Sequence, residues 1–375
     1  MSQTDAPNSN GRCVLTNVPR VGFYFTMRQY EPERDPEDII FPSCMRSMMA
    51  ALGNRGYDYT HFVGVTGAGF YLNWKDGWHS DNTAIYYMVP FDEHTQVFAN
   101  AFESIGYTMQ MIPLKGADGI GEAEARQRII ENIDAGKPVL SHGVVGPPET
   151  CIITGYDEGG DVVIGWSFFQ EFDAFNGGLE FEPNGMFRKR NWFPAAFDLF
   201  CIGERHEFPD SNIVIRRSLE WAVKVVRTAE TWEGRTNNGL AAYDAWADHL
   251  LRDDEITPDG AIPEGSSDIP FNVHDDAVGT VAEGRYYASE YLIRLARLDR
   301  GIRTLLLRAA GCYSREHDLM WKIWNCCGGN GRSPEHIERF ADPKTRRQIV
   351  ELIRQARDED EMAIEYIEAA LSETI

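Results

Sequence analysis

A cysteine beside an apolar helical pattern is the first feature of this chain that could do covalent chemistry. Cys44 follows Pro42 and Ser43, and from there to Leu52 apolar residues recur every three to four positions. Proline disfavours helix before it and serine often caps one, so the pattern predicts Cys44 in the first helical turn. Unpaired N–H groups and the positive dipole end there favour a thiolate, which indicates a nucleophile. The alternative is a packing residue, because free cysteine is usually buried.

Histidines are the residue type expected to take a proton from such a thiol. His142 ends a predicted strand over 138–142, and His61 follows the Cys44 helix. His274, beside two aspartates, is a further candidate from the C-terminal half. A structural histidine is the alternative for each. No second ligand stands at helical spacing from His274, so we expect no metal site, and no cofactor motif is present.

The elements that would position these residues divide the chain into two parts with different patterns. Residues 20–210 alternate helical and strand patterns, after a polar segment over 1–19 that we expect to be poorly ordered. The clearest hairpin has strands over 150–156 and 162–166. Residues 211–375 carry apolar residues at helical spacing throughout. We therefore expect an α+β domain followed by an all-α helical domain.

The composition limits the classes of partner. The chain has 375 residues, with Lys+Arg 36 and Asp+Glu 58, a net charge of −22. This charge disfavours nucleic acid or an anionic membrane and suits a cationic partner such as an amine. No apolar run approaches the roughly 18 residues of a membrane span, and the polar N-terminus does not resemble a signal peptide. Seven scattered cysteines fit a reducing cytoplasm better than a disulfide scaffold.

Three segments in this order resemble one family. They are Cys44 at its helix, the stretch 59–70 (YTHFVGVTGAGF), and the pair GKPVL at 136–140 and TCIITGYD at 150–157. Together they resemble the N-terminal domain of butirosin biosynthesis protein H and, more remotely, bacteriocin-processing papain-like peptidases. The helix over 285–292 also resembles the helical C-terminal part of butirosin-H-like chains.

The resemblance implies a papain-like fold, in which a cysteine at a helix start faces a histidine on a strand. A third polar residue on the next strand orients the imidazole. It also implies acyl transfer from a carrier-protein thioester to an amine. The partners would be a small-molecule amine and an acyl-thioester donor such as an acyl carrier protein.

The chain departs from the family pattern at the histidine. That position is Thr150, flanked by Glu149 and Cys151, and the orienting position of the next strand falls near Trp166. Threonine is no base near neutral pH, and a carboxylate such as Glu149 raises the pKa of a nearby thiol. On a regular strand, either Thr150 or the pair Glu149 and Cys151 faces the cleft, not both. We expect these residues, with Trp166, His61 and His274, to line the substrate site.

Two functions remain open from the sequence. The first is a cysteine-dependent acyltransferase that forms an acyl-enzyme on Cys44, with His142 or Glu149 handling protons. A thioester donor makes this feasible, because a leaving thiolate needs no protonation. The second is a papain-like scaffold that binds a small molecule or peptide without covalent chemistry. A peptidase is least favoured, because it needs the missing base.

Overall fold

The computed structural model describes residues 11–85, 88–89, 91–206, 210–231, 236–259, 261 and 268–373. Contacts divide the chain into two compact units, each made of two segments. The first unit comprises residues 1–62 and 101–209, and the second comprises residues 63–100 and 210–375. The sequence predicts 20–210 as one domain, whereas residues 63–100 group with the helical half of the chain.

An antiparallel sheet forms the centre of the first unit. In the described part of the chain its eight strands follow the order β3-β9-β4-β5-β6-β8-β7, with β1 paired to β5. The strands are β1 (Cys13–Val14), β3 (Tyr107–Pro113), β4 (Val139–His142), β5 (Thr150–Asp157), β6 (Val162–Trp166), β7 (Glu180–Phe181), β8 (Phe187–Arg190) and β9 (Asp198–Arg205). The predicted hairpin is confirmed as β5 and β6, which are consecutive neighbours in the sheet.

The N-terminal segment contributes to this sheet. Residues 1–10 of the predicted disordered segment 1–19 lie outside the described residues. Cys13 and Val14 pair with Tyr156 and Gly155 on β5, and both are buried. The prediction of poor order is therefore wrong for β1. Two residues are too short a run to show strand periodicity in a sequence.

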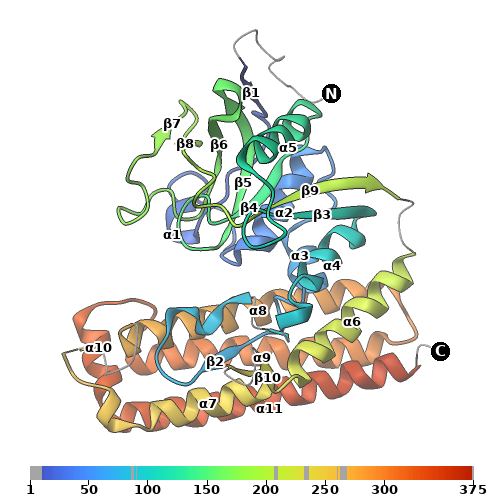
Figure 1. Ribbon diagram of the computed structural model, residues 1–375. Coiled ribbons are helices and arrows are strands. Elements are labelled where there is room, and N and C mark those ends of the chain that lie inside the picture. The colour runs from blue at the N-terminus through green and yellow to red at the C-terminus, as the bar shows by residue number, and fades with distance from the viewer. Residues whose placement is uncertain are drawn as a thin grey trace. The chain divides into compact units, whose positions relative to one another are not determined.

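Helices alternate with the strands of this sheet along the chain. They are α1 (Tyr24–Met27), α2 (Ile40–Ala51), α3 (Tyr59–Val65), α4 (Gln96–Ser104) and α5 (Glu122–Asp134), and α3 and α4 each cross a unit boundary. Helix α5 buries Ala125, Ile129 and Ile133 at four-residue spacing and packs against β4 and β5, as Figure 1 shows. It is followed by Gly136 at φ 75°, the left-handed conformation that ends many helices.

One short apolar run is assigned wrongly by the sequence pattern. Residues 21–25 read as a strand, but α1 begins at Tyr24. Its amide N–H donates to the Asp38 carboxylate at 2.6 Å, a partner 14 residues away. Short apolar runs do not separate strand from helix, and here a distant side chain satisfies the first turn.

The second unit is mainly helical. Its helices are α6 (Ser211–Arg227), α7 (Leu240–Leu250), α8 (Pro270–Leu298), α9 (Arg303–Cys327), α10 (Pro334–Ala341) and α11 (Pro343–Glu373). Helices α8, α9 and α11 lie side by side in Figure 1, with α9 in contact with both others. A small antiparallel sheet of β2 (Asn73–Lys75), β11 (Thr236–Asn238) and β10 (Glu230–Thr231) belongs to the same unit. The helical C-terminal half is therefore confirmed.

A glycine explains why part of the predicted first domain joins these helices. A Cβ atom on Gly64 would lie 2.3 Å from the Tyr291 ring of α8, so only glycine permits this approach. The neighbouring Gly67 has φ 80°, and a Cβ there would meet Trp221 of α6. These glycines therefore serve close packing and a turn.

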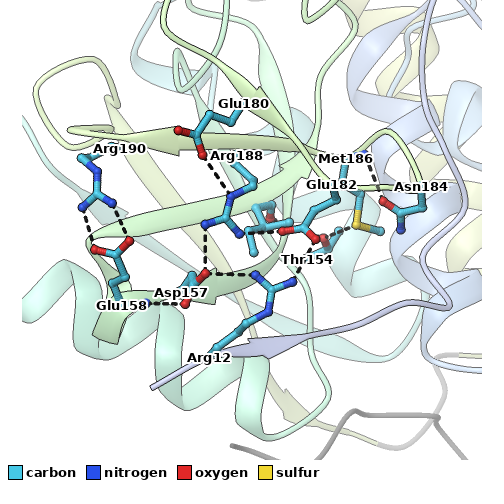
Figure 2. Close-up of polar contacts among 11 residues, drawn as sticks. Arg12, Thr154, Asp157, Glu158, Glu180, Glu182, Asn184, Met186, Arg188 and Arg190 are labelled. Carbon is cyan, nitrogen blue, oxygen red and sulfur yellow. Dashed lines mark hydrogen bonds and ion pairs between the residues drawn. The ribbon is translucent and has the colours of Figure 1, made fainter. Parts of the chain in front are cut away.

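An ion-pair network joins residues in or next to β1, β5, β7 and β8 (Figure 2). Arg188 of β8 contacts Asp157 at 2.9 Å and Glu182 at 2.6 Å, and Arg12 pairs with the same two carboxylates at 3.0 and 2.9 Å. The arginines hold down the pKa of both carboxyl groups against the opposing effect of burial.

Within the described residues, no helix is long and apolar enough to cross a bilayer.

Candidate functional site

Cys44 lies deeper in its helix than the sequence predicts. Helix α2 begins at Ile40, so Cys44 is its fifth residue, and Ser43 N–H already donates to the Ile39 carbonyl. The predicted Ser43 cap is wrong, and its hydroxyl has no hydrogen-bond partner among the described residues. Pro42 misled the prediction because proline lacks an N–H, and first-turn N–H groups need no partner within the helix.

The environment of Cys44 favours the thiol over the thiolate. Cys44 has no exposed surface, and burial raises the pKa of its thiol well above the ordinary value. Cys151 and Glu149 raise this pKa further, while Arg46 opposes them. The Sγ atom donates a hydrogen bond to the Thr150 carbonyl at 3.7 Å. The predicted activation of Cys44 by a helix N-terminus is therefore wrong, and a base must take its proton if it is to attack.

A histidine, the residue type expected to act as this base, lies next to Thr150. His142 Nε2 is 3.0 Å from the Thr150 hydroxyl, and His142 Nδ1 is 2.9 Å from both carboxylate oxygens of Asp198. A carboxylate only accepts hydrogen bonds, so Nδ1 carries the proton and Nε2 accepts from the hydroxyl. The order carboxylate, imidazole, hydroxyl is the arrangement that prepares a hydroxyl to attack a carbonyl.

Strand register brings these three residues together. His142 on β4 pairs with Thr150 on β5, and Leu140 pairs with Phe200 on β9. Because side chains alternate along strands, His142, Thr150 and Asp198 point to one face of the sheet. The backbone also fixes Asp198, whose Oδ1 accepts from His142 N–H at 3.1 Å. All three are buried, with exposed fractions of 4, 2 and 7 %.

Glu149 lies at the edge of this group. It is half-buried and directly precedes Thr150. Loss of water raises the pKa of its carboxyl group to about 7, and the nearby His142 opposes this shift. Glu149 therefore exchanges its proton near neutral pH, the range in which a general base works best.

Cys151 and Trp166 have structural partners. Cys151 pairs with Ser141 on the opposite face from Thr150, and its Sγ donates to the Val145 carbonyl at 3.6 Å. Trp166 Nε1 donates to the Val18 carbonyl at 3.3 Å. Ser167, next to the position expected to orient the base, donates to the Val145 carbonyl instead.

The remaining histidines lie elsewhere. His61 on α3 shares a 2.9 Å hydrogen bond with the Ser104 hydroxyl. His274 on α8 belongs to the second unit, where Trp246 donates to its Nδ1 and Phe340 stacks on its ring. Burial lowers the pKa of His274 to about 4, so it is neutral at pH 7. No group of three or more His, Cys, Asp or Glu in the described ranges could hold a metal ion.

The sequence reasoning missed Asp198. It is the first residue of β9, 56 positions after His142, and it precedes an apolar strand. A carboxylate at the start of a buried strand is a signal, since such residues are rarely buried without a partner. The sequence gives no indication that β9 lies beside β4.

No model of a known protein family matches the chain, and no curated protein matches it either.

Proposed function

We propose that this protein transfers an acyl group from a thioester to an amine, through an acyl-enzyme on Cys44. One observation carries the proposal: Cys44 and His142 hydrogen-bond to the same residue, Thr150, and Asp198 orients His142. In this proposal His142, on the neighbouring strand β4, supplies the base that the chain lacks at position 150. Helix α2 packs against β5, as the papain-like interpretation requires.

In this reaction the Cys44 thiol turns from the Thr150 carbonyl toward His142, and Nε2 takes its proton as sulfur attacks the donor carbonyl carbon. The C–S bond of the donor breaks, and its thiolate leaves without needing a proton. The amine then attacks the acyl-enzyme, and Cys44 is released as a thiol. Because Cys44 is buried, water is kept from the acyl-enzyme, which favours transfer over hydrolysis. The acidic chain suits a cationic amine, and a thiol-dependent reaction suits the cytoplasm.

The experiment is to incubate the protein with an acyl N-acetylcysteamine thioester, in the presence and absence of a diamine acceptor. Intact-mass spectrometry should show one added acyl group that maps to Cys44 and disappears when the amine is added. Cys44→Ala should lose the adduct at residue 44, and Cys151→Ala is the matched control that should keep it. An unmodified wild-type protein would contradict the proposal.

A second candidate function is a binding scaffold without covalent chemistry. The fully buried, protonated thiol of Cys44 favours it, since a packing cysteine has these properties. On this account thioesters leave the protein unmodified, and iodoacetamide labels Cys44 no faster than Cys151.

A further inference from the structure

We propose that the Thr150 hydroxyl is a second acyl-accepting nucleophile in this site, activated by His142 and held in position through Asp198. The inference rests on acyl transfer as the reaction class. It differs from the proposed function in the atom that forms the covalent bond.

The hydrogen-bond geometry favours the hydroxyl over the thiol. His142 Nε2 lies 3.0 Å from Thr150 Oγ1, whereas the hydrogen bond from Cys44 Sγ goes to the Thr150 carbonyl. A general base must be within hydrogen-bond reach of the proton that it abstracts. In this structure the proton within reach of His142 is that of Thr150.

Asp198 makes His142 suitable for this role. Its two oxygens lie 2.9 Å from Nδ1, which fixes the tautomer in which Nε2 carries the lone pair that accepts a proton. As Nε2 becomes protonated, the carboxylate stabilises the resulting imidazolium. A histidine that only fills space needs no such oriented carboxylate together with a hydroxyl on its other nitrogen.

The site adjoins a partly exposed loop in the chain. Thr150 follows the half-buried Glu149 and the exposed Pro148, although Thr150 itself is 2 % exposed. Gly146, with φ 95°, lies in the same loop. A donor that displaces this loop would reach Thr150 at the first residue of its strand.

The step balances without an oxidant or a further reactant. His142 Nε2 takes the hydroxyl proton, and Thr150 Oγ1 forms a bond to the carbonyl carbon of an acyl thioester. The C–S bond breaks, and its electron pair leaves on sulfur, which takes the proton back from His142. The same step operates on a thioester at Cys44 or on the donor itself, because both present a carbonyl carbon and a sulfur leaving group. The product is an ester on Thr150, which an amine then attacks.

The experiment uses the Cys44→Ala protein with the same N-acetylcysteamine thioester, so that the first nucleophile is absent. We expect one acyl group on Thr150, stable to neutral hydroxylamine and cleaved by alkaline hydroxylamine, as an ester is. In the double variant with Thr150→Val the nucleophilic oxygen is absent, so the adduct at residue 150 should be abolished. Thr150→Ser, which keeps the hydroxyl, should retain it.

Thr154→Val is the matched control, because Thr154 is also a buried threonine of β5 but donates to the Ile164 carbonyl. It should leave the adduct unchanged. An adduct on Cys44 in the wild type with none on Thr150 in Cys44→Ala would overturn this inference and leave the proposed function intact. No adduct in either protein would overturn both, and Thr150 would then belong to a structural hydrogen-bond network.

Discussion

Both units contain a cluster of buried charged side chains. The two clusters differ in the groups that complete their hydrogen-bond networks. In the first unit Asp198 and His142 lead by hydrogen bonds to the Thr150 hydroxyl. In the second unit Arg285 is surrounded by acceptors within one closed network. Its guanidinium donates to both Glu316 oxygens at 3.1 Å, to Asp360 and the Tyr243 hydroxyl at 2.8 Å, and to the carbonyls of Gly69 and Tyr71 at 2.8 and 3.2 Å.

The difference shows that buried charges have different roles in the two units. Arg285, Glu316 and Asp360 are each 0 % exposed, and the residues of the cluster come from α7, α8, α9, α11 and the segment after α3. Such a cluster favours one arrangement of helices, because any other arrangement leaves a charge unpaired. The Asp198 cluster uses only two strands besides β5 and ends at a group that can form a bond. Variants of the two clusters should therefore differ in what they lose.

The largest effect should come from Asp198→Asn. An amide cannot hold the His142 tautomer that leaves Nε2 basic, so acyl-adduct formation should slow by about 10³–10⁴-fold. Stability should change little, because the amide oxygen still accepts from His142 N–H. Rapid-quench mass spectrometry measures the rate, and urea unfolding measures stability. A variant that reacts at the wild-type rate would place Asp198 outside the reaction.

Next in size is Arg285→Met, which leaves the Glu316 and Asp360 carboxyl groups without their cation. The free energy of unfolding should fall by about 3–5 kcal/mol. Urea denaturation followed by circular dichroism measures the loss. Arg354→Met is the matched control: its side chain is 52 % exposed and pairs with Glu351, so it should cost less than about 1 kcal/mol. Equal losses would show that the Arg285 cluster is not a specific stabilising element.

A smaller effect concerns pH. Burial raises the pKa of Glu316 from 4.5 to about 8, against the opposing charge of Arg285. The folded state therefore keeps a proton that the unfolded state loses, and the free energy of unfolding falls as pH rises from about 5 to 8. Glu316→Gln mimics the protonated form and should flatten this dependence. Parallel pH profiles of the two proteins would contradict the shift.

The smallest effect should come from Arg188→Met in the network of Figure 2. Like Arg285, Arg188 bridges carboxylates, but its side chain is 16 % exposed and water screens its contacts. The expected cost is about 1 kcal/mol, reduced at high salt. Thermal unfolding at 0.05 and 0.5 M NaCl measures it. A loss as large as that of Arg285→Met would remove the distinction between partly and fully buried arginine clusters.

Local pattern accounts for what the sequence predicts well. Helix α5 and the β5–β6 hairpin follow from spacing and from Gly136, which ends the helical pattern. The first residue of α2 cannot be predicted from the local pattern, because proline is tolerated inside a first turn as well as before it. The local pattern also does not predict that residues 63–100 belong to the helical unit, because this depends on the contact between Gly64 and Tyr291.

The candidate site was predictable only in part. Cys44, His142 and Thr150 could be named from residue type and strand position. Asp198 could not, because the pairing of β4 with β9 is a choice of topology between distant segments. The sequence pattern favours a thiolate at Cys44, whereas burial raises the pKa of its thiol, and burial depends on everything packed around it.

The most direct test of the account is the amount of thiol released when the wild-type protein meets an acyl N-acetylcysteamine thioester without amine. Chromatographic quantification of free N-acetylcysteamine should show a burst of about one equivalent per chain, followed by turnover only after a diamine is added. Release at the rate of the buffer control, with no burst, would contradict covalent acyl transfer at this site.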